Sequence, residues 1–186
     1  MLISTEIIMI NKVLYIHDQD HARQMGFAYD LVANKDQPHM LLNLAKMYER
    51  GEPFFDEPDW DKALFYHQQA ILAGVYESYY HLARWSLYGL GPHKKDPKRA
   101  KTYLNDGADQ KNAHCLLLLA RWYDKGWFGE EKQPIRALAA CRQAAKQGLA
   151  EAWRELARCY IVGTPYFSKP DITQAMRCRY YQNAHR

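Results

Sequence analysis

The sequence lacks the short motifs on which most enzyme classes depend. It contains no phosphate-binding loop of the form G-x-x-x-x-G-K-[ST], no G-x-S-x-G nucleophile turn and no H-E-x-x-H zinc motif. No nucleophile, base and orienting group recur at a spacing that would bring them together. We therefore expect a protein that is not an enzyme and that needs no cofactor.

Paired cysteines are lacking as well. The four cysteines form no C-x-x-C pair and lie among small or apolar residues, at Cys115, Cys141, Cys159 and Cys178. Isolated cysteines of this kind are typical of free, buried thiols. Because free thiols persist in reducing compartments, we expect a cytoplasmic protein with four free thiols.

The sequence has no apolar run long enough to cross a membrane. Its most apolar stretch, residues 1–16, is interrupted by Glu6 and Lys12, and it has neither the basic start nor the small-residue cleavage site of a signal peptide. Apolar residues recur there at helical spacing, which favours an N-terminal helix that packs on the rest of the chain. Met1 and Met9 are both possible starts of the protein.

Each half of the chain is poor in charge of one sign. Residues 1–93 contain 7 Lys and Arg against 12 Asp and Glu, whereas residues 94–186 contain 18 against 9. Basic surface can bind nucleic acid, so this is one alternative function for the C-terminal half. The total charge of +4 is modest and the basic residues form no continuous run, which argues against that alternative.

The clearest positive feature is a pattern of eight residues that begins with Leu-Ala and ends in Gly. In three of its four copies the third residue is Arg. Its copies begin at Leu44, Leu82, Leu119 and Leu156, at intervals of 38, 37 and 37 residues. A second mark, an Asp or Gln four residues before an alanine, recurs with nearly the same period. Its alanines are Ala63, Ala100, Ala137 and Ala175. Two marks with one period predict a tandem repeat.

Each repeat is predicted to contain two helices. The first is apolar at helical spacing and ends at the Gly, and the second begins after an N-cap residue, with Pro97 and Pro134 at the first helical position. The predicted N-caps are Asp59, Asp96, Gln133 and Asp171. The fold class is therefore all-α, a right-handed α-solenoid of antiparallel helix pairs, with the motif leucines and alanines at the tight contacts. Leucine in place of Ala120 or Ala137 should overpack such a contact.

These residues resemble the Sel1-like repeat (SLR) family, a branch of the tetratricopeptide-like superfamily. The family motif is roughly A-x-x-x-L-G/A-x-x-Y-x-x-G, a loop, and D-x-x-x-A-x-x-W/Y-Y-x-x-A-A-x-x-G. The first repeat matches it at Leu44, Ala45, Tyr48, Gly51, Asp59, Ala63, Tyr66, Ala70 and Gly74, and the third at Leu119, Ala120, Tyr123, Gly126, Ala137, Ala144, Ala145 and Gly148. The second repeat differs from the motif at Ser86 and Lys111, and the fourth repeat differs from it after Ala175. The resemblance covers residues 37–184 and implies an adaptor or scaffold that assembles complexes.

The predicted organisation has two parts. Residues 1–36 are an N-terminal segment with a capping half-repeat, and residues 37–186 are four repeats in one continuous solenoid domain. The polar final helix suits a terminal cap, with Tyr180 and Tyr181 as its packed face. Three repeat loops carry adjacent aromatic residues, among them Trp127 and Phe128, which are expected to lie between the helices or else to contact a partner.

The predicted binding site lies on the first helices, which face the concave side in tetratricopeptide-like hairpins. The residue two positions after each motif leucine is basic, namely Lys46, Arg84, Arg121 and Arg158. Such a row of cations suits an acidic peptide or protein segment. Apolar neighbours predicted to lie between the charges are Tyr80, Leu87, Ile161 and Leu42.

The alternative interpretation is that these basic residues form ordinary ion pairs on the surface. Glu49, Asp124 and Glu155 lie three residues from Lys46, Arg121 and Arg158, respectively. Arg84 has no such neighbour and instead lies one turn from both Tyr80 and Tyr88, so a stacked guanidinium held ready for a ligand is expected there. The sequence does not indicate the oligomeric state or the partner.

A metal-dependent enzyme is the alternative to an adaptor. His17 and His21 would lie one turn apart on a helix, beside Asp18 and Asp20, and could hold a divalent metal ion. The same aspartates suit the capping of a helix start, and the remaining histidines are too scattered in the sequence to supply a third ligand. We therefore predict no metal site.

Overall fold

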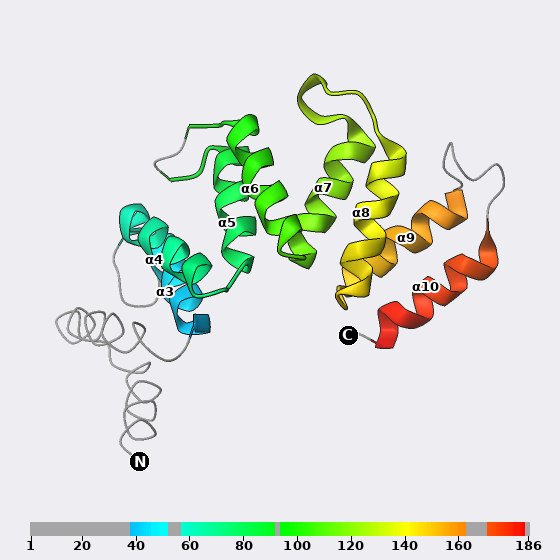
Figure 1. Ribbon diagram of the computed structural model, residues 1–186, viewed down its shortest axis with the longest axis horizontal. Helices are drawn as coiled ribbons and strands as arrows, with labels where there is room; N and C mark the ends of the chain where they lie inside the picture. The colour runs from blue at the N-terminus through cyan, green and yellow to red at the C-terminus, as the bar shows by residue number, and fades with distance from the viewer. Residues whose placement is uncertain (1–37, 52–56, 92–93, 163–170, 185–186) are drawn as a thin grey trace, which may run out of the picture. The chain divides into compact units, whose positions relative to one another are not determined.

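The computed structural model describes residues 38–51, 57–91, 94–162 and 171–184 (Figure 1). Among these residues it contains eight α-helices, one short 3-10 turn and no strand. The helices are α3 (Pro38–Arg50), α4 (Trp60–Leu72), α5 (Glu77–Tyr88), α6 (Pro97–Asp109), α7 (Ala113–Lys125), α8 (Pro134–Lys146), α9 (Ala150–Val162) and α10 (Ile172–Ala184), and the turn is η1 (Trp127–Gly129). None of these helices is long and apolar enough to span a bilayer. The predicted N-terminal helix, the capping half-repeat, His17 and His21 lie outside the described residues.

The chain divides into two compact units, residues 1–78 and 79–186. In the first unit α3 packs on α4, and the rings of Tyr48 and Tyr66 stack with centroids 5.5 Å apart. In the second unit α7 packs on α8 and α9 packs on α10, and α6 and α8 each contact the first helix of the following pair. The predicted all-α fold of paired helices, with four repeats, is confirmed.

The second helix of each pair begins where the sequence predicts. The carboxylates of Asp59, Asp96 and Asp171 accept hydrogen bonds from the backbone N–H three residues later, at 3.0, 3.0 and 2.9 Å. Each therefore satisfies an N–H group that the first turn of a helix leaves free. Gln133 occupies the equivalent position before α8 but makes no capping bond through its side chain.

A backbone hydrogen bond explains why the third repeat tolerates Gln133. In every repeat the N–H of the N-cap residue donates to the carbonyl of the residue four positions after the motif leucine. These bonds are Asp59 to Tyr48 at 2.9 Å, Asp96 to Ser86 at 2.7 Å, Gln133 to Tyr123 at 2.8 Å and Asp171 to Tyr160 at 3.0 Å. The bond joins the end of one helix to the start of the next without using a side chain. Ser86 can therefore replace the usual tyrosine as well.

The motif residues form the core, as predicted. Leu44, Leu82 and Leu156 are at most 2% exposed, and the alanines that follow them are also buried. In the second unit, one buried cluster surrounds Trp122 on α7 and Leu104 on α6, and another joins α7, α8, α9 and α10. Ala120 and Ala137 are less enclosed, at 6% and 8% exposed, and both line a surface hollow. The predicted overpacking at these two alanines must therefore be reconsidered.

The packed face of the last helix differs from the prediction. Tyr180 is 71% exposed and Tyr181 is 45% exposed, although the latter ring stacks on Trp153 at 4.9 Å between centroids. Ala175 and Cys178 form the buried face of α10 instead. Aromatic residues pointed to Tyr180 as a core residue, but the helix has no following repeat within the described residues to cover that side.

Candidate functional site

The four basic residues of the predicted site all lie on first helices, with Lys46 on α3 in the first unit and the other three in the second. Lys46 Nζ lies 2.9 Å from Glu77 Oε1. Arg121 contacts Glu151 at 2.9 Å and Glu155 at 3.5 Å, and Arg158 contacts Glu155 at 3.0 Å. Three of the four cations therefore already hold a carboxylate.

Only the pair of Arg158 with Glu155 is the local pair that the sequence suggested. Lys46 and Arg121 instead pair with carboxylates about 30 residues further along the chain. For Arg121 this links α7 to α9, across the junction between the third and fourth repeats. Partial burial works against the charge of Arg121, but the hydrogen bond and the charge of Glu151, together with those of Glu155, outweigh it and raise its pKa above the ordinary value.

Arg84 differs from the other three, as the sequence predicted. Its guanidinium carbon lies 5.8 Å from the centroid of the Tyr80 ring, which is the distance of a cation–π contact. Within the part of the chain that the structure describes, no carboxylate lies within ion-pair distance of Arg84. Tyr80 also contacts the ring of His114, with centroids 5.3 Å apart, so the stacked pair is anchored to α7.

The apolar neighbours of the site are only partly where the sequence placed them. Tyr88 and Ile161 are exposed, at 58% and 50%. Leu87 is 3% exposed and Leu42 is 4% exposed, so both belong to the core and not to a surface between the cations. Leu87 packs in the cluster around Trp122. Helical spacing assigned these leucines to the right helix, but the next helix covers the face that they occupy.

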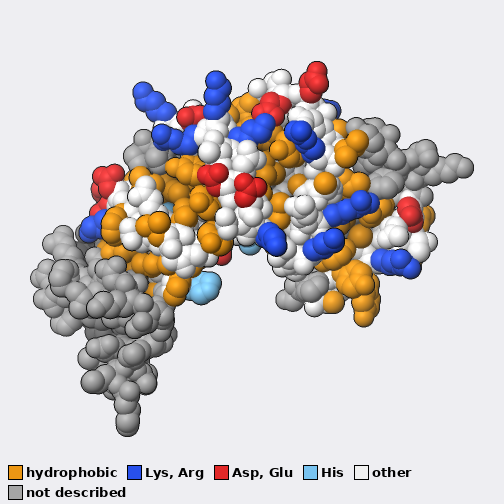
Figure 2. Space-filling view, viewed as in Figure 1, with side chains coloured by type: hydrophobic (Ala, Val, Ile, Leu, Met, Phe, Trp, Pro, Cys, Tyr) orange, Lys and Arg blue, Asp and Glu red, His pale blue; other side chains and the backbone are white. Residues whose placement is uncertain are grey.

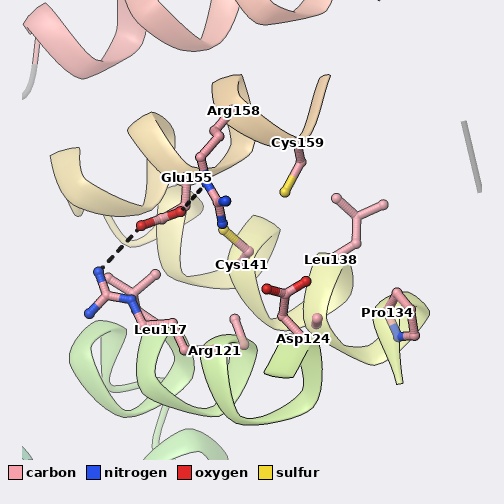
Figure 3. Close-up of a pocket in the computed structure, with 11 residues that line it drawn as sticks. Leu117, Arg121, Asp124, Pro134, Leu138, Cys141, Glu155, Arg158 and Cys159 are labelled. Carbon is pink, nitrogen blue, oxygen red and sulfur yellow. Dashed lines mark hydrogen bonds and ion pairs between the residues drawn. The ribbon is translucent and has the colours of Figure 1, made fainter. Parts of the chain in front are cut away.

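A hollow on the surface of the second unit brings two of the predicted residues together (Figure 3). It lies between α7, α8 and α9. Its apolar lining consists of Leu117, Ala120, Pro134, Ala137 and Leu138, and its polar and sulfur-bearing lining consists of Arg121, Asp124, Cys141, Glu155, Arg158 and Cys159. We call it the repeat groove. Two arginines and two carboxylates leave its rim balanced in charge above an apolar floor.

The thiols of the repeat groove are poor nucleophiles. Burial raises the pKa of Cys141 to about 12, and it also raises the pKa of Cys159. Both thiols therefore stay protonated near neutral pH, and a protonated thiol does not attack an electrophile. All four cysteines are free in the structure. The groove is thus better suited to contact another molecule than to react with it.

Several cations of the basic half pair with carboxylates within the fold. Lys101 contacts Glu130 at 2.6 Å, Lys125 contacts Asp124 at 3.1 Å, and Arg154 contacts Glu151 at 3.1 Å. Figure 2 shows the same mixture, with acidic side chains interspersed among the basic ones. Paired cations have less charge to offer to phosphates, which weighs against a nucleic-acid interface.

One part of this surface was not predicted from the sequence. Glu151 and Glu155 are the anions that hold Arg121, and only the register between neighbouring repeats could have indicated them. Trp127 and Phe128 were expected either between the helices or at a partner, and the structure shows that they differ in exposure. Trp127 is partly buried against Trp122, whereas Phe128 is 49% exposed.

Comparison with known proteins agrees with this repeat structure. The model of the Sel1 repeat family matches residues 38–75, 77–112, 113–149 and 150–178. These segments begin near α3, α5, α7 and α9, so each match corresponds to one helix pair. No curated protein sequence matches the chain.

Several solved structures share the fold. A Sel1 repeat protein from Oxalobacter formigenes is 17% identical, with a TM-score of 0.69 over 90% of this chain and 70% of that protein. A protective antigen of uropathogenic Escherichia coli with an SLR fold is 22% identical, with a TM-score of 0.65 over 84% of this chain and 32% of the antigen. An immunity protein from Pseudomonas aeruginosa is 22% identical, with a TM-score of 0.61 over 87% of this chain and 58% of that protein.

The chain thus spans less than two thirds of the length of the last two structures, and identities this low show the fold alone. The family match has a firmer basis, because it covers four consecutive repeats and most of the chain. The helix pairs, their shared hydrogen bond and the buried motif residues follow the same period. The chain belongs to the Sel1 repeat family.

Proposed function

We propose that this chain is a non-enzymatic adaptor that binds a segment of another protein along the first helices of its second unit. The observation that carries the proposal is the repeat groove, which combines an apolar floor with charged groups on two successive first helices. Proteins of this family generally take part in protein–protein interactions. Reduced thiols support a reducing compartment such as the cytoplasm for this activity.

The charges of the site suggest how the segment would be held. Arg84 offers a guanidinium that is positioned by Tyr80 and holds no carboxylate among the described residues. Arg158 is more exposed than Arg121, with 58% against 38% of its side chain accessible, and can turn from Glu155 towards a ligand. A segment with acidic side chains would therefore contact Arg84 and Arg158, while its small apolar side chains would lie over Leu117 and Leu138. Arg84 and Tyr88 do not line the groove, so the segment must extend along the first helices beyond the groove to reach them.

The structure also shows which substitutions test the proposal cleanly. Arg121→Glu would place a third carboxylate beside Glu151 and Glu155, so it should destabilise the fold and confuse the result. Arg84→Glu adds no such repulsion among the described residues. Ala137→Leu would extend a side chain into the groove and obstruct it sterically. The matched control is Arg177→Glu, which changes an exposed arginine on α10 that does not line the groove.

The experiment is affinity capture with the full chain, followed by mass spectrometry and a binding measurement on the captured protein. Arg84→Glu and Ala137→Leu should each weaken binding at least tenfold, whereas Arg177→Glu should leave it within about twofold, and all three variants should keep the circular dichroism of the parent. Binding should also weaken as salt concentration rises. A captured partner that binds Arg84→Glu and Ala137→Leu as tightly as the parent chain would contradict the proposal.

A further inference from the structure

A second hollow lies at the edge of the second unit, where the loops after α5 and α7 approach each other. It has a volume of about 230 Å³ and is lined by Leu87, Tyr88, Lys95, Trp127 and Phe128. We call it the aromatic hollow. It shares no lining residue with the repeat groove. A site for a drug-sized ligand usually occupies about 300–1,000 Å³, so this volume suits a single large side chain.

The backbone of Phe128 is strained while its ring is exposed. Phe128 has φ 58° and ψ 34°, in the left-handed region that residues with a Cβ atom rarely adopt. The residue is nevertheless 49% exposed, so its burial gives limited compensation for that conformation. Strained residues of this kind cluster at binding and catalytic sites, where the position of the side chain matters.

The buried ring of Trp122 packs against the two aromatic residues of the loop following α7 that line the aromatic hollow. The Trp122 ring lies 5.1 Å from the Phe128 ring and 5.9 Å from the Trp127 ring. Lys101 Nζ lies 5.7 Å from the Trp122 ring and is fixed by Glu130, which accepts a hydrogen bond of 2.6 Å from it. This hydrogen bond is the main reason why the pKa of Glu130 is below its ordinary value. The aromatic hollow is therefore preformed and needs little ordering to accept a ligand.

Lys95 supplies the charge of the aromatic hollow. Its Nζ lies 5.5 Å from the centroid of the Phe128 ring, and no carboxylate in the described ranges lies within ion-pair distance of it. Its backbone is fixed against Gly89, where an added Cβ atom would come within 3.1 Å of the Lys95 nitrogen. Lys95 is also the one charged residue among the residues that line the aromatic hollow. A negative ligand group is therefore favoured beside Lys95.

We propose that the aromatic hollow binds a short segment of a partner protein in which one large apolar side chain stands next to an acidic side chain. The apolar side chain would contact Tyr88, Trp127 and Phe128, and the carboxylate would pair with Lys95. A cationic side chain is disfavoured by Lys95. A nucleic-acid strand would need a row of cations to follow its phosphates, whereas one cation lines the aromatic hollow. The proposal does not depend on the repeat groove, because the two surfaces can act separately.

Selection from a random library of 12-residue peptides displayed on phage tests this proposal with the full chain as bait. Enriched peptides should combine Trp, Phe, Leu or Met with an adjacent Asp or Glu. A synthetic peptide of the enriched sequence should bind at least tenfold more weakly to Lys95→Glu and to Phe128→Gly than to the parent chain. Glycine adopts the left-handed conformation readily, so Phe128→Gly removes the ring while keeping the fold.

Two control variants separate this site from ordinary charge effects and from the repeat groove. Lys98→Glu changes an exposed lysine on α6 that does not line the aromatic hollow, and Ala137→Leu obstructs the repeat groove. Both should bind the peptide within about twofold of the parent chain. The proposal is overturned if no peptide is enriched, if the peptide binds Lys95→Glu and Phe128→Gly as tightly as the parent, or if a 12-nucleotide single-stranded RNA displaces it.

Discussion

The second and third repeats each connect to the following repeat through a turn with the same backbone conformation but different residues. We call this turn the corner. Where α6 leads into α7, the second repeat has Gly107 in the helix and Lys111 in the left-handed position, with φ 59°. Where α8 leads into α9, the third repeat has Ala144 and Gly148 at the equivalent positions, with φ 86° at the glycine. The backbone hydrogen bonds of the two corners are nevertheless the same, from Asn112 to Gly107 at 2.9 Å and from Leu149 to Ala144 at 3.4 Å.

The comparison shows that the backbone conformation of the corner is kept from repeat to repeat, while the volumes of the two side chains that face each other there are adjusted to one another. Gly107 faces Cys115 on α7, and the residue equivalent to Cys115 in the fourth repeat is Ala152, which lies in one buried cluster with Ala144. Ala70 and Ser78 occupy the same two positions at the first corner, and both are fully buried. A larger residue on one side therefore goes with a smaller residue on the other. This is how a tight helix contact keeps its packing density while its sequence changes.

The largest expected effect is at Gly107. Gly107→Ala should lower the free energy of unfolding by about 2–3 kcal/mol, although alanine is the better helix former, because the added Cβ would overlap the Cys115 sulfur and lie 3.0 Å from the Tyr79 Cβ. Denaturant unfolding followed by circular dichroism measures this change. In the third repeat the same position already holds alanine.

A double variant sharpens this test. Gly107→Ala combined with Cys115→Ala reproduces the pair of alanines at the next corner, so it should recover most of the lost stability. The recovery should be incomplete, because the Cβ atom added at residue 107 still lies close to the Cβ atoms of residue 115 and Tyr79. A double variant no more stable than Gly107→Ala alone would show that the two positions do not compensate for each other.

The next effect contrasts the alanines of the two repeats. Ala83 is 0% exposed, so Ala83→Leu should overpack the second repeat and lower stability by about 1–3 kcal/mol. Ala137 lines the repeat groove, where a larger side chain has space, so Ala137→Leu should change stability by less than about 1 kcal/mol. Thermal unfolding of the two variants under identical conditions checks the difference. Equal destabilisation would mean that the groove at Ala137 is closed.

Alkaline pH should weaken both corners in a comparable way. Burial raises the pKa of Cys115 and that of Cys141 from 9.0 to about 12. Each thiol is then protonated in the folded chain but ionises in the unfolded chain above pH 9, so its contribution to stability falls as pH rises from 9 towards 12. The expected loss for each thiol is about 1 kcal/mol between pH 9 and pH 10, and it approaches about 1.4 kcal/mol per pH unit above pH 10. Unfolding at pH 9 and pH 10 measures it, and Cys115→Ala should remove about half of the loss assigned to the two thiols.

The sequence predicted the parts of the structure that depend on local residue type. Asp59, Asp96 and Asp171 could be identified as caps because a short carboxylate before a helix can hardly act otherwise, and the spacing of the motif leucines identified the core. The period also located the four cations correctly on the first helices. These features need no knowledge of which helices come together.

The remaining features depend on contacts between helices that are distant in sequence. Leu87 could not be assigned to the core and Tyr180 to the surface, because helical periodicity does not show which face a neighbouring helix covers. Glu151 and Glu155 reach Arg121 from the next repeat, and sequence spacing within one helix pointed to Asp124 instead. The left-handed conformation of Phe128 also has no local signal, since turn chemistry favours glycine or asparagine there.

The smallest expected effect again compares the two corners, at Lys111 and Gly148. In the left-handed region, a residue with a Cβ atom lowers the stability of the folded chain by about 1–2 kcal/mol relative to glycine. Glycine in turn lowers stability by about 0.4–1 kcal/mol, because it makes the unfolded chain more flexible. The first effect is larger, so Lys111→Gly should stabilise the chain by about 0.5–1 kcal/mol and raise the melting temperature by about 1–4 °C. Lys111 is exposed, so the substitution removes no packing. Gly148→Ala, which imposes the strain on the third repeat, should lower the melting temperature. A decrease for Lys111→Gly would mean that the lysine side chain contributes more than its backbone strain removes, and the two corners would then differ in more than the residues exchanged between them.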